Sequence, residues 1–174
     1  EGISDVIKSN VNNLFSLREK LKRFNLSVKR GVVLHGPPGT GKTKIVKCLA
    51  KDADYSVLYC LPSDFNPNSG GIRRVCSMAK DLAPCLLVIE DIDWIAKDRS
   101  SGNGAFVIEL MNYLDGLESF GDIITLGTTN HLADLEEAVK NRPGRFDRLI
   151  EIGNPTKESI RKMIERFTIN FTLD

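Results

Sequence analysis

Short apolar runs alternate along this chain with longer segments in which apolar residues recur every three or four positions. The runs at 32–34 and 86–89 are apolar at every position, so both faces of these strands need cover. This alternation is typical of a parallel sheet whose strands are joined by crossover helices. The predicted strands span 31–35, 56–61, 85–90, 123–128 and 148–152. The predicted helices span 3–24, 42–51, 72–82, 104–114 and 157–167.

The opening helix and two loops complete this outline. One apolar stripe is available on the helix, formed by Val6, Ile7, Val11, Leu14, Phe15 and Leu21. Segments 64–71 and 97–104 are rich in Asn, Pro, Ser and Gly and are predicted to be loops.

Composition and charge narrow the classes of function. The length of 174 residues and the hydrophobic content of 41% fit one domain with a core of ordinary size. Lys and Arg total 24 against 23 Asp and Glu, so a formal net charge of +1 gives no global attraction to nucleic acid or anionic membrane. The longest apolar run, 85–89, is far shorter than the ~20 residues that span a bilayer.

Cysteine usage indicates the redox environment. The cysteines are Cys48, Cys60, Cys76 and Cys85, with no Cys-x-x-Cys pair. Free thiols in the cytoplasm or another reducing compartment are favoured by this wide spacing. Zinc or disulfides are the alternative, and His35 and His131 are the histidines that could act as co-ligands.

The strongest motif follows the first predicted strand and opens a helix. Residues 36–43 read Gly-Pro-Pro-Gly-Thr-Gly-Lys-Thr, the Gly-x-x-x-x-Gly-Lys-Thr phosphate loop in its required context. Glycines let successive backbone N–H groups face one concavity, and the helix adds its positive end. Lys42 is expected to reach the β- and γ-phosphates, and the Thr43 hydroxyl to bind Mg²⁺. The candidate nucleotide-binding residues are Gly36, Pro37, Pro38, Gly39, Thr40, Gly41, Lys42, Thr43 and Lys44.

A phosphate loop alone does not define the reaction, because kinases, GTPases, motor ATPases and nucleotide sensors all use one. The third predicted strand ends in Glu90-Asp91-Ile92-Asp93. Side chains at the carboxyl end of a parallel strand lie in the crevice where ligands bind. One carboxylate can therefore hold the Mg²⁺ shell while the other polarises an attacking water.

Four motifs in order carry a family resemblance. They are the phosphate loop at 36–43, the apolar-acidic strand at 84–93, Thr-Thr-Asn at 128–130 and Asn-Arg-Pro-Gly-Arg-Phe-Asp-Arg at 141–148. Together they resemble the AAA family of ATPases. The resemblance implies a three-layer α/β P-loop NTPase fold around a five-stranded parallel sheet of order 5-1-4-3-2. It also implies a large ATPase subdomain at 1–155 and the start of a truncated helical lid at 156–174.

The resemblance also implies site residues and partners. Asn130 matches the polar sensor of the γ-phosphate, while Arg142 and Arg145 match arginine fingers that act on the nucleotide of a neighbouring subunit. A guanidinium at that place contributes ~10³–10⁵ in rate. The expected function is Mg²⁺-dependent ATP hydrolysis that remodels or translocates a protein or complex, in a ring of six or seven copies. A solvated turn is the alternative for the arginine segment.

The acidic pair departs from the family pattern. Most members place Asp first and Glu second, whereas here Glu90 precedes Asp91. By position, Glu90 is expected to serve the Mg²⁺ shell and Asp91 the water. This order, with Thr-Thr-Asn-His at 128–131, resembles the branch that includes the mitochondrial translocase of the Rieske protein. A nucleotide-dependent scaffold with little turnover and a small-molecule phosphotransferase are the rival functions.

Three aromatic and histidine side chains have structural interpretations. No aromatic residue followed by a hydrophobic residue and glycine is present at 63–71, where the family carries its substrate-gripping loop. The resemblance places Phe65 just before that loop, so a buried anchor is predicted. Trp94, just after the acidic pair, is predicted to pack in the core or at an interface. His131 is a candidate for lining the crevice.

Overall fold

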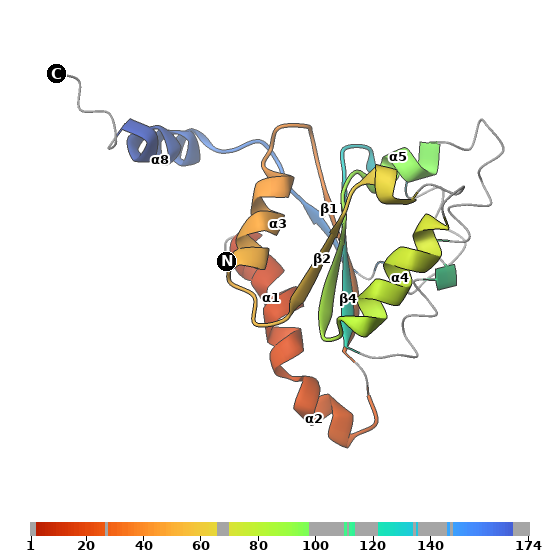
Figure 1. Cartoon of the computed structure of the whole chain (residues 1–174). Coiled ribbons are helices and arrows are strands. Elements are labelled where there is room, and N and C mark those ends of the chain that lie inside the picture. Colours follow the sequence, from red (N-terminus) through yellow and green to blue (C-terminus); the bar gives the residue numbers. More distant parts are fainter. Residues whose placement is uncertain are drawn as a thin grey trace.

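The computed structural model describes residues 3–26, 28–65, 70–97, 110, 112–113, 122–133, 135, 146 and 148–168. Helices and strands alternate over most of this length (Figure 1). The helical elements are α1 (Ile3–Ser16), α2 (Arg18–Arg23), α3 (Lys42–Lys51), the 3₁₀ turn η1 (Pro62–Phe65), α4 (Gly71–Asp81), α5 (Ile92–Lys97) and α8 (Lys157–Thr168). The strands are β1 (Lys29–His35), β2 (Ser56–Cys60), β3 (Cys85–Ile89), β4 (Ile123–Thr129) and β5 (Arg148–Glu151).

The five strands form one all-parallel sheet. Their order is β2-β3-β4-β1-β5, the same order that the family resemblance implies. Each predicted strand is present with its ends within two residues of the predicted ones. The predicted α/β class with a central five-stranded sheet is confirmed.

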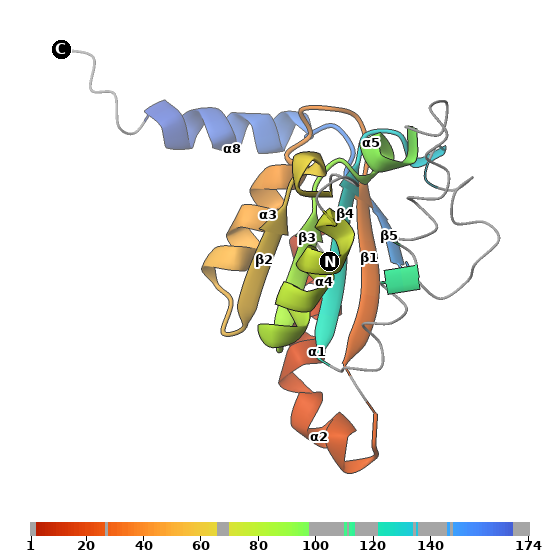
Figure 2. The same ribbon diagram turned by 45° about the vertical axis from the view of Figure 1, so that its right-hand side comes forward.

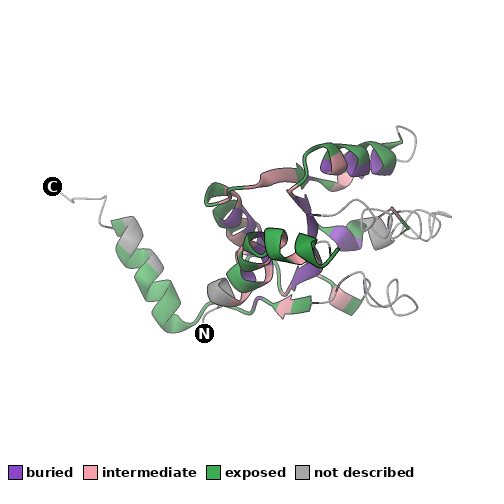
Figure 3. Cartoon of the chain, turned by 90° about the horizontal axis from the view of Figure 1, so that it is seen from below, coloured by how far each residue is buried: buried purple, intermediate pink, exposed green. Residues whose placement is uncertain are grey.

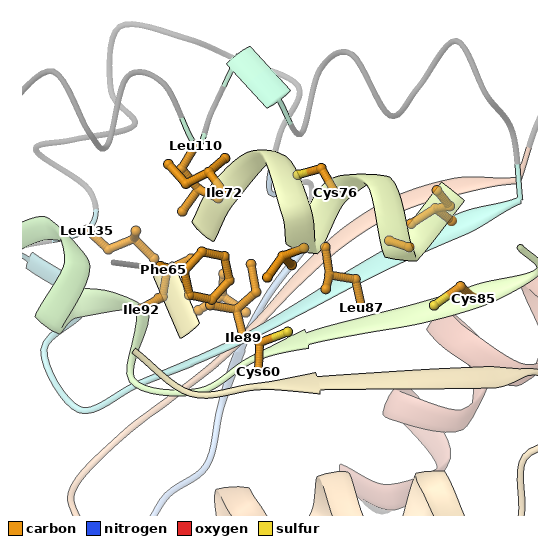
Figure 4. Packing of buried hydrophobic residues seen from close by; sticks show 14 residues of the cluster. Cys60, Phe65, Ile72, Cys76, Cys85, Leu87, Ile89, Ile92, Leu110 and Leu135 are labelled. Atoms are coloured by element: carbon orange, nitrogen blue, oxygen red, sulfur yellow. The ribbon is translucent and has the colours of Figure 1, made fainter. Parts of the chain in front are cut away.

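Helices cover both faces of the sheet, as the doubly apolar strands require. On one face α1 and α3 pack against side chains such as Val32 and Leu86, and on the other α4 packs against Val33 and Leu87 (Figure 1). Figure 4 shows Ile72 and Cys76 of α4 packed over Leu87 and Ile89 of the sheet, with Phe65 beside them. Figure 3 shows buried residues on the strands and on the helix faces that meet them. Alternation along each strand thus builds two cores, one on each side.

The opening segment is two helices rather than the single predicted one. α1 buries Ile7, Val11 and Phe15 against the sheet, which confirms the predicted stripe. The helix is interrupted at Leu17, which is exposed, and α2 has no buried residue. α2 extends past the end of the sheet (Figure 1), so little apolar surface is available to hold a continuous helix.

Two short elements, η1 and α5, are absent from the sequence prediction, which placed residues 64–71 in a loop. Pro62 opens η1, where a missing N–H costs little, and Asp64 Oδ2 accepts a hydrogen bond from the Leu61 N–H at 2.8 Å. Phe65 is only 1% exposed, so the predicted buried anchor is confirmed. The predicted helix 104–114 and loop 97–104 lie almost entirely outside the described residues.

The last helix, α8, confirms the predicted helix 157–167 and stands away from the sheet (Figure 2). All of its side chains that the structure describes are exposed. The division into subdomains at 155 stays a prediction. In the described part of the chain, no helix has the length and apolar character needed to cross a membrane.

The four cysteines are free, and three of them lie in the core. Burial raises the pKa of the Cys60 thiol to about 12 and that of Cys76 to about 11. Such thiols stay protonated and unreactive at neutral pH. The compartment stays a prediction.

Candidate active site

A cavity of about 530 Å³ opens at the carboxyl ends of β1, β3 and β4. Its walls combine the phosphate loop, the acidic pair and the end of β4, three segments that the sequence places far apart. The lining residues are Pro38, Gly39, Gly41, Lys42, Thr43, Lys44, Lys47, Glu90, Asp91, Thr128 and Asn130. Gly36, Pro37 and Thr40, also predicted to bind nucleotide, belong to the loop but not to this wall.

The phosphate loop curls because its three glycines take positive φ angles. These are 146° at Gly36, 78° at Gly39 and 97° at Gly41. The Thr40 hydroxyl donates to the Pro37 carbonyl at 3.0 Å and closes the loop on itself. Gly41 caps α3 without a side-chain hydrogen bond, so the helix N-terminus presents its backbone N–H groups to an anion.

Position 36 requires glycine for two reasons, its positive φ angle and the lack of space for a side chain. A Cβ built there would lie 2.2 Å from the Ile152 carbonyl oxygen, because the chain leaving β5 passes directly beside the loop. The Ile152 N–H donates to the His35 carbonyl at 2.7 Å and holds this close approach.

We expect Gly36→Ala to lower the free energy of unfolding by about 2–4 kcal/mol, from backbone strain plus the clash with Ile152. The matched control is Gly39→Ala, which has a positive φ but nothing within 4 Å of the added Cβ. It should cost only about 1–2 kcal/mol. Urea unfolding of both variants measures the difference, and equal losses would show that the contact with Ile152 has no energetic weight.

Lys42 lies inside the loop with its side chain directed to backbone oxygens. Its ammonium group donates to the carbonyls of Gly36 at 2.7 Å and Pro37 at 2.8 Å, and the residue is 7% exposed. Burial lowers the pKa of Lys42, and the carboxylates of Asp91, Asp93 and Glu90 oppose that shift. The cation is thus held in the wall of the cavity close to three negative charges.

The first carboxylate of the acidic pair lies against the start of α3. The Thr43 hydroxyl donates to Glu90 Oε2 at 2.9 Å, and Glu90 is 6% exposed. Its second oxygen, Oε1, is buried without a hydrogen-bond partner among the described residues. An unpaired buried carboxylate oxygen beside a hydroxyl fits Mg²⁺, a hard cation that prefers oxygen ligands. Burial first, and then the Glu90 carboxylate, raises the pKa of Tyr59 to about 12.

The second carboxylate faces the cavity and is exposed. Asp91 sits at φ 46°, and its N–H donates to Thr128 Oγ1 at 3.0 Å. The Asn130 amide donates to Asp91 Oδ1 at 3.3 Å, which brings together two residues 39 positions apart. Partial burial, then the charges of Glu90 and Asp93, raises the pKa of Asp91, while Lys42 lowers it. A carboxylate made more basic and open to the cavity is suited to accept a proton.

Two side chains, those of Trp94 and His131, lie elsewhere than the sequence predicted, and two predicted arginines cannot be compared. Trp94 is 58% exposed, so its predicted place in the core is wrong, while an interface role stays a prediction. Ile92, two residues earlier on the six-residue helix α5, is 1% exposed, so α5 turns Ile92 and not Trp94 toward the core. His131 is exposed and does not line the cavity. Arg142 and Arg145 lie outside the described residues.

Sequence reasoning missed two residues of the site and one pairing beside it. Lys47 lines the cavity, and its position four residues after Thr43 on a helix could have indicated this. Tyr59 approaches Glu90 from a neighbouring strand, which no local motif signals. Asp93, 6% exposed, accepts a hydrogen bond from the Thr129 hydroxyl at 2.8 Å, a pairing across 36 residues.

Comparison with known proteins gives a consistent result. Residues 32–154 match the family described as "ATPase family associated with various cellular activities (AAA)". The chain is 36% identical over 86% of its length to a cell division cycle protein 48 homolog of Archaeoglobus fulgidus, of which it covers 22%. It is 34% identical over 90% of its length to the ATP-dependent zinc metalloprotease FtsH 1 of Alkaliphilus metalliredigens, covering 28%. It is 33% identical over 84% of its length to proteasome-activating nucleotidase 2 of Halobacterium salinarum, covering 38%. The chain therefore spans between a fifth and two fifths of these relatives.

Proposed function

This chain belongs to the AAA family of ATPases, and on that basis we propose that it binds ATP with Mg²⁺ in the cavity and hydrolyses it to ADP and phosphate. The phosphate loop and the N-terminus of α3 receive the phosphates, and Lys42 turns from the loop carbonyls to the β- and γ-phosphate oxygens. Thr43 and Glu90 are the residues that would hold Mg²⁺. When bound, the ion neutralises negative charge on the β- and γ-phosphates.

The chain's own residues perform the proton transfer in this proposal. Asp91 accepts a proton from a water that attacks the γ-phosphorus, the bond to the β-phosphate oxygen breaks, and the proton passes on to the released phosphate. The Asn130 amide, already beside Asp91, orients the water and the γ-phosphate. The observation that carries this division of roles is the contrast between a buried Glu90 bonded to Thr43 and an exposed Asp91 facing the cavity.

Lys42→Ala tests this function. We expect the variant to lower ATP turnover about 10²–10³-fold, because one preorganised positive donor to the phosphates is lost, and to weaken ATP binding as well. Fluorescence titration with an ATP analogue and a phosphate-release assay measure both effects. Lys51→Ala, at the far end of the same helix, is the matched control and should behave like the unmodified protein.

The outcomes separate the rival functions. ATP binding without phosphate release by the unmodified protein favours a nucleotide-dependent scaffold. Transfer of the phosphate to a metabolite favours a small-molecule phosphotransferase. Turnover that survives in Lys42→Ala contradicts catalysis in this cavity.

The larger task proposed for the protein is remodelling or translocation of a protein or complex in a ring of six or seven copies. Two relatives are named as an ATP-dependent metalloprotease and a proteasome-activating nucleotidase, which supports work on protein substrates. Arg142 and Arg145 are proposed to complete the site of a neighbouring copy. Phe65 is buried and therefore not available to grip a substrate. This supports a branch of the family whose members do not grip their substrate with an aromatic side chain at this position. The likeness to the Rieske-translocase branch stays a prediction.

A further inference from the structure

Two neighbouring threonines end β4 beside the acidic turn (residues 90–93, which lead from β3 into α5), and each hydroxyl is bonded to that turn. Thr128 Oγ1 accepts from the Asp91 N–H at 3.0 Å, and Thr129 Oγ1 donates to Asp93 Oδ1 at 2.8 Å. Thr128 is 1% exposed, Thr129 is 0% exposed and Asp93 is 6% exposed. The bond from Thr129 to Asp93 is buried, and a hydrogen bond away from water is stronger than one at the surface.

Thr129 also fixes the chain beyond it. Its oxygen accepts from the His131 N–H at 3.0 Å while its proton goes to Asp93. One hydroxyl therefore acts as donor and acceptor at once, which sets its rotamer. Asn130 lies in the chain between Thr129 and His131, whose N–H this hydroxyl holds.

The two hydroxyls hold the backbone on both sides of the hydrogen bond between Asn130 and Asp91, which the proposed hydrolysis needs. On one side they hold the acidic turn at Asp91 and Asp93, and on the other they hold the chain on both sides of Asn130. The Asn130 amide reaches Asp91 Oδ1 at 3.3 Å, a long hydrogen bond that a small shift of either backbone would break.

We propose that Thr129 and Asp93 are positioning residues for hydrolysis, which hold the Asn130 amide against the Asp91 carboxylate. This inference rests on the proposed ATPase function. The Thr129 hydroxyl transmits the position of α5, through Asp93, to Asn130. Neither Thr129 nor Asp93 lines the cavity, so both act through other residues.

Thr129→Val keeps the shape of the side chain and removes the hydroxyl. We expect turnover by the assembled protein to fall about 10–100-fold, as for supporting residues around a catalytic group, with little change in KM for MgATP. Thr129→Ser keeps the hydroxyl and should restore most of the turnover. Thr125→Val is the matched control, a threonine 8% exposed on the same strand that does not line the cavity.

A double-mutant cycle distinguishes positioning from a purely structural role. If Thr129 acts through Asn130, Thr129→Val should cost almost nothing further once Asn130→Ala is present. Full additivity, or wild-type turnover in Thr129→Val, overturns the inference. A fall in Thr129→Val that Thr129→Ser does not recover also overturns it. A wild-type protein that hydrolyses no ATP instead contradicts the proposed function itself.

Two further measurements apply if Thr129→Val does not fold. Asp93→Ala breaks the same link from its other end and enters the same cycle with Asn130→Ala. Amide hydrogen exchange of the unmodified protein needs no variant. The His131 N–H is expected to exchange slowly because Thr129 accepts its hydrogen bond, and exchange at the rate of a free amide would remove the basis of the inference.

Discussion

Asp91→Asn is expected to lower ATP turnover by about 10²–10⁴-fold, the contribution of a positioned general base. The amide keeps the size of the side chain and can still accept from Asn130, but it cannot take a proton from water. ATP affinity should stay within about twofold, since Asp91 touches the attacking water and not the phosphates. Nucleotide titration and phosphate release on the same preparation separate binding from turnover.

Comparison of Glu90→Gln with Asp91→Asn shows which of the two carboxylates serves Mg²⁺ and which serves the attacking water. Since Glu90 is buried against Thr43 and has an unpaired oxygen, its substitution should raise the Mg²⁺ concentration needed for half-maximal turnover. Asp91→Asn should leave that concentration unchanged. Asp81→Asn, at the exposed end of α4, is a control that should alter neither quantity. The reverse pattern in the two site variants would show that the roles are exchanged.

Arg145→Ala is expected to reduce turnover by about 10³–10⁵-fold, the contribution of an arginine finger. That range corresponds to roughly 4–7 kcal/mol of activation free energy. Charge builds up on the γ-phosphoryl oxygens as the bond breaks, and a guanidinium from the next copy would stabilise it. ATP binding should persist, because the phosphate loop of the same copy is intact.

The matched control for this variant is Arg161→Ala. Arg161 lies on α8, with a side chain 82% exposed and paired to Glu165 at 3.1 Å. Surface pairs of this kind contribute ~0–1 kcal/mol to stability, so turnover should not change. If Arg145→Ala hydrolyses ATP at the rate of the control, the arginine segment at 141–148 is a solvated turn without a catalytic role.

The fold could be predicted because its signals are local. Strands buried on both faces show unbroken apolar runs, and a phosphate loop needs its glycines and Lys42 in consecutive positions. The cavity could be predicted in outline for the same reason, since parallel strands deliver Asp91 and Asn130 to one edge of the sheet.

What escaped prediction depends on partners distant in sequence. Nothing near Asp93 indicates that Thr129, 36 residues later, donates to it. The break at Leu17 follows from where the sheet ends, which the amphipathic pattern of 3–24 does not reveal. α5 has six residues, fewer than two helical turns, so its periodicity could not be distinguished from a loop and the exposure of Trp94 could not be foreseen.

Hydrolysis in the proposed ring requires that one copy of the chain supplies the cavity and the next supplies the arginine. The most direct measurement mixes Arg145→Ala subunits with Asp91→Asn subunits and follows phosphate release. In a random equal mixture about a quarter of the cavities combine an intact Asp91 with an intact Arg145 from the neighbour. We predict turnover well above that of either variant alone. Turnover no higher than that of the two separate variants, in rings shown to contain both, would contradict a site shared between copies.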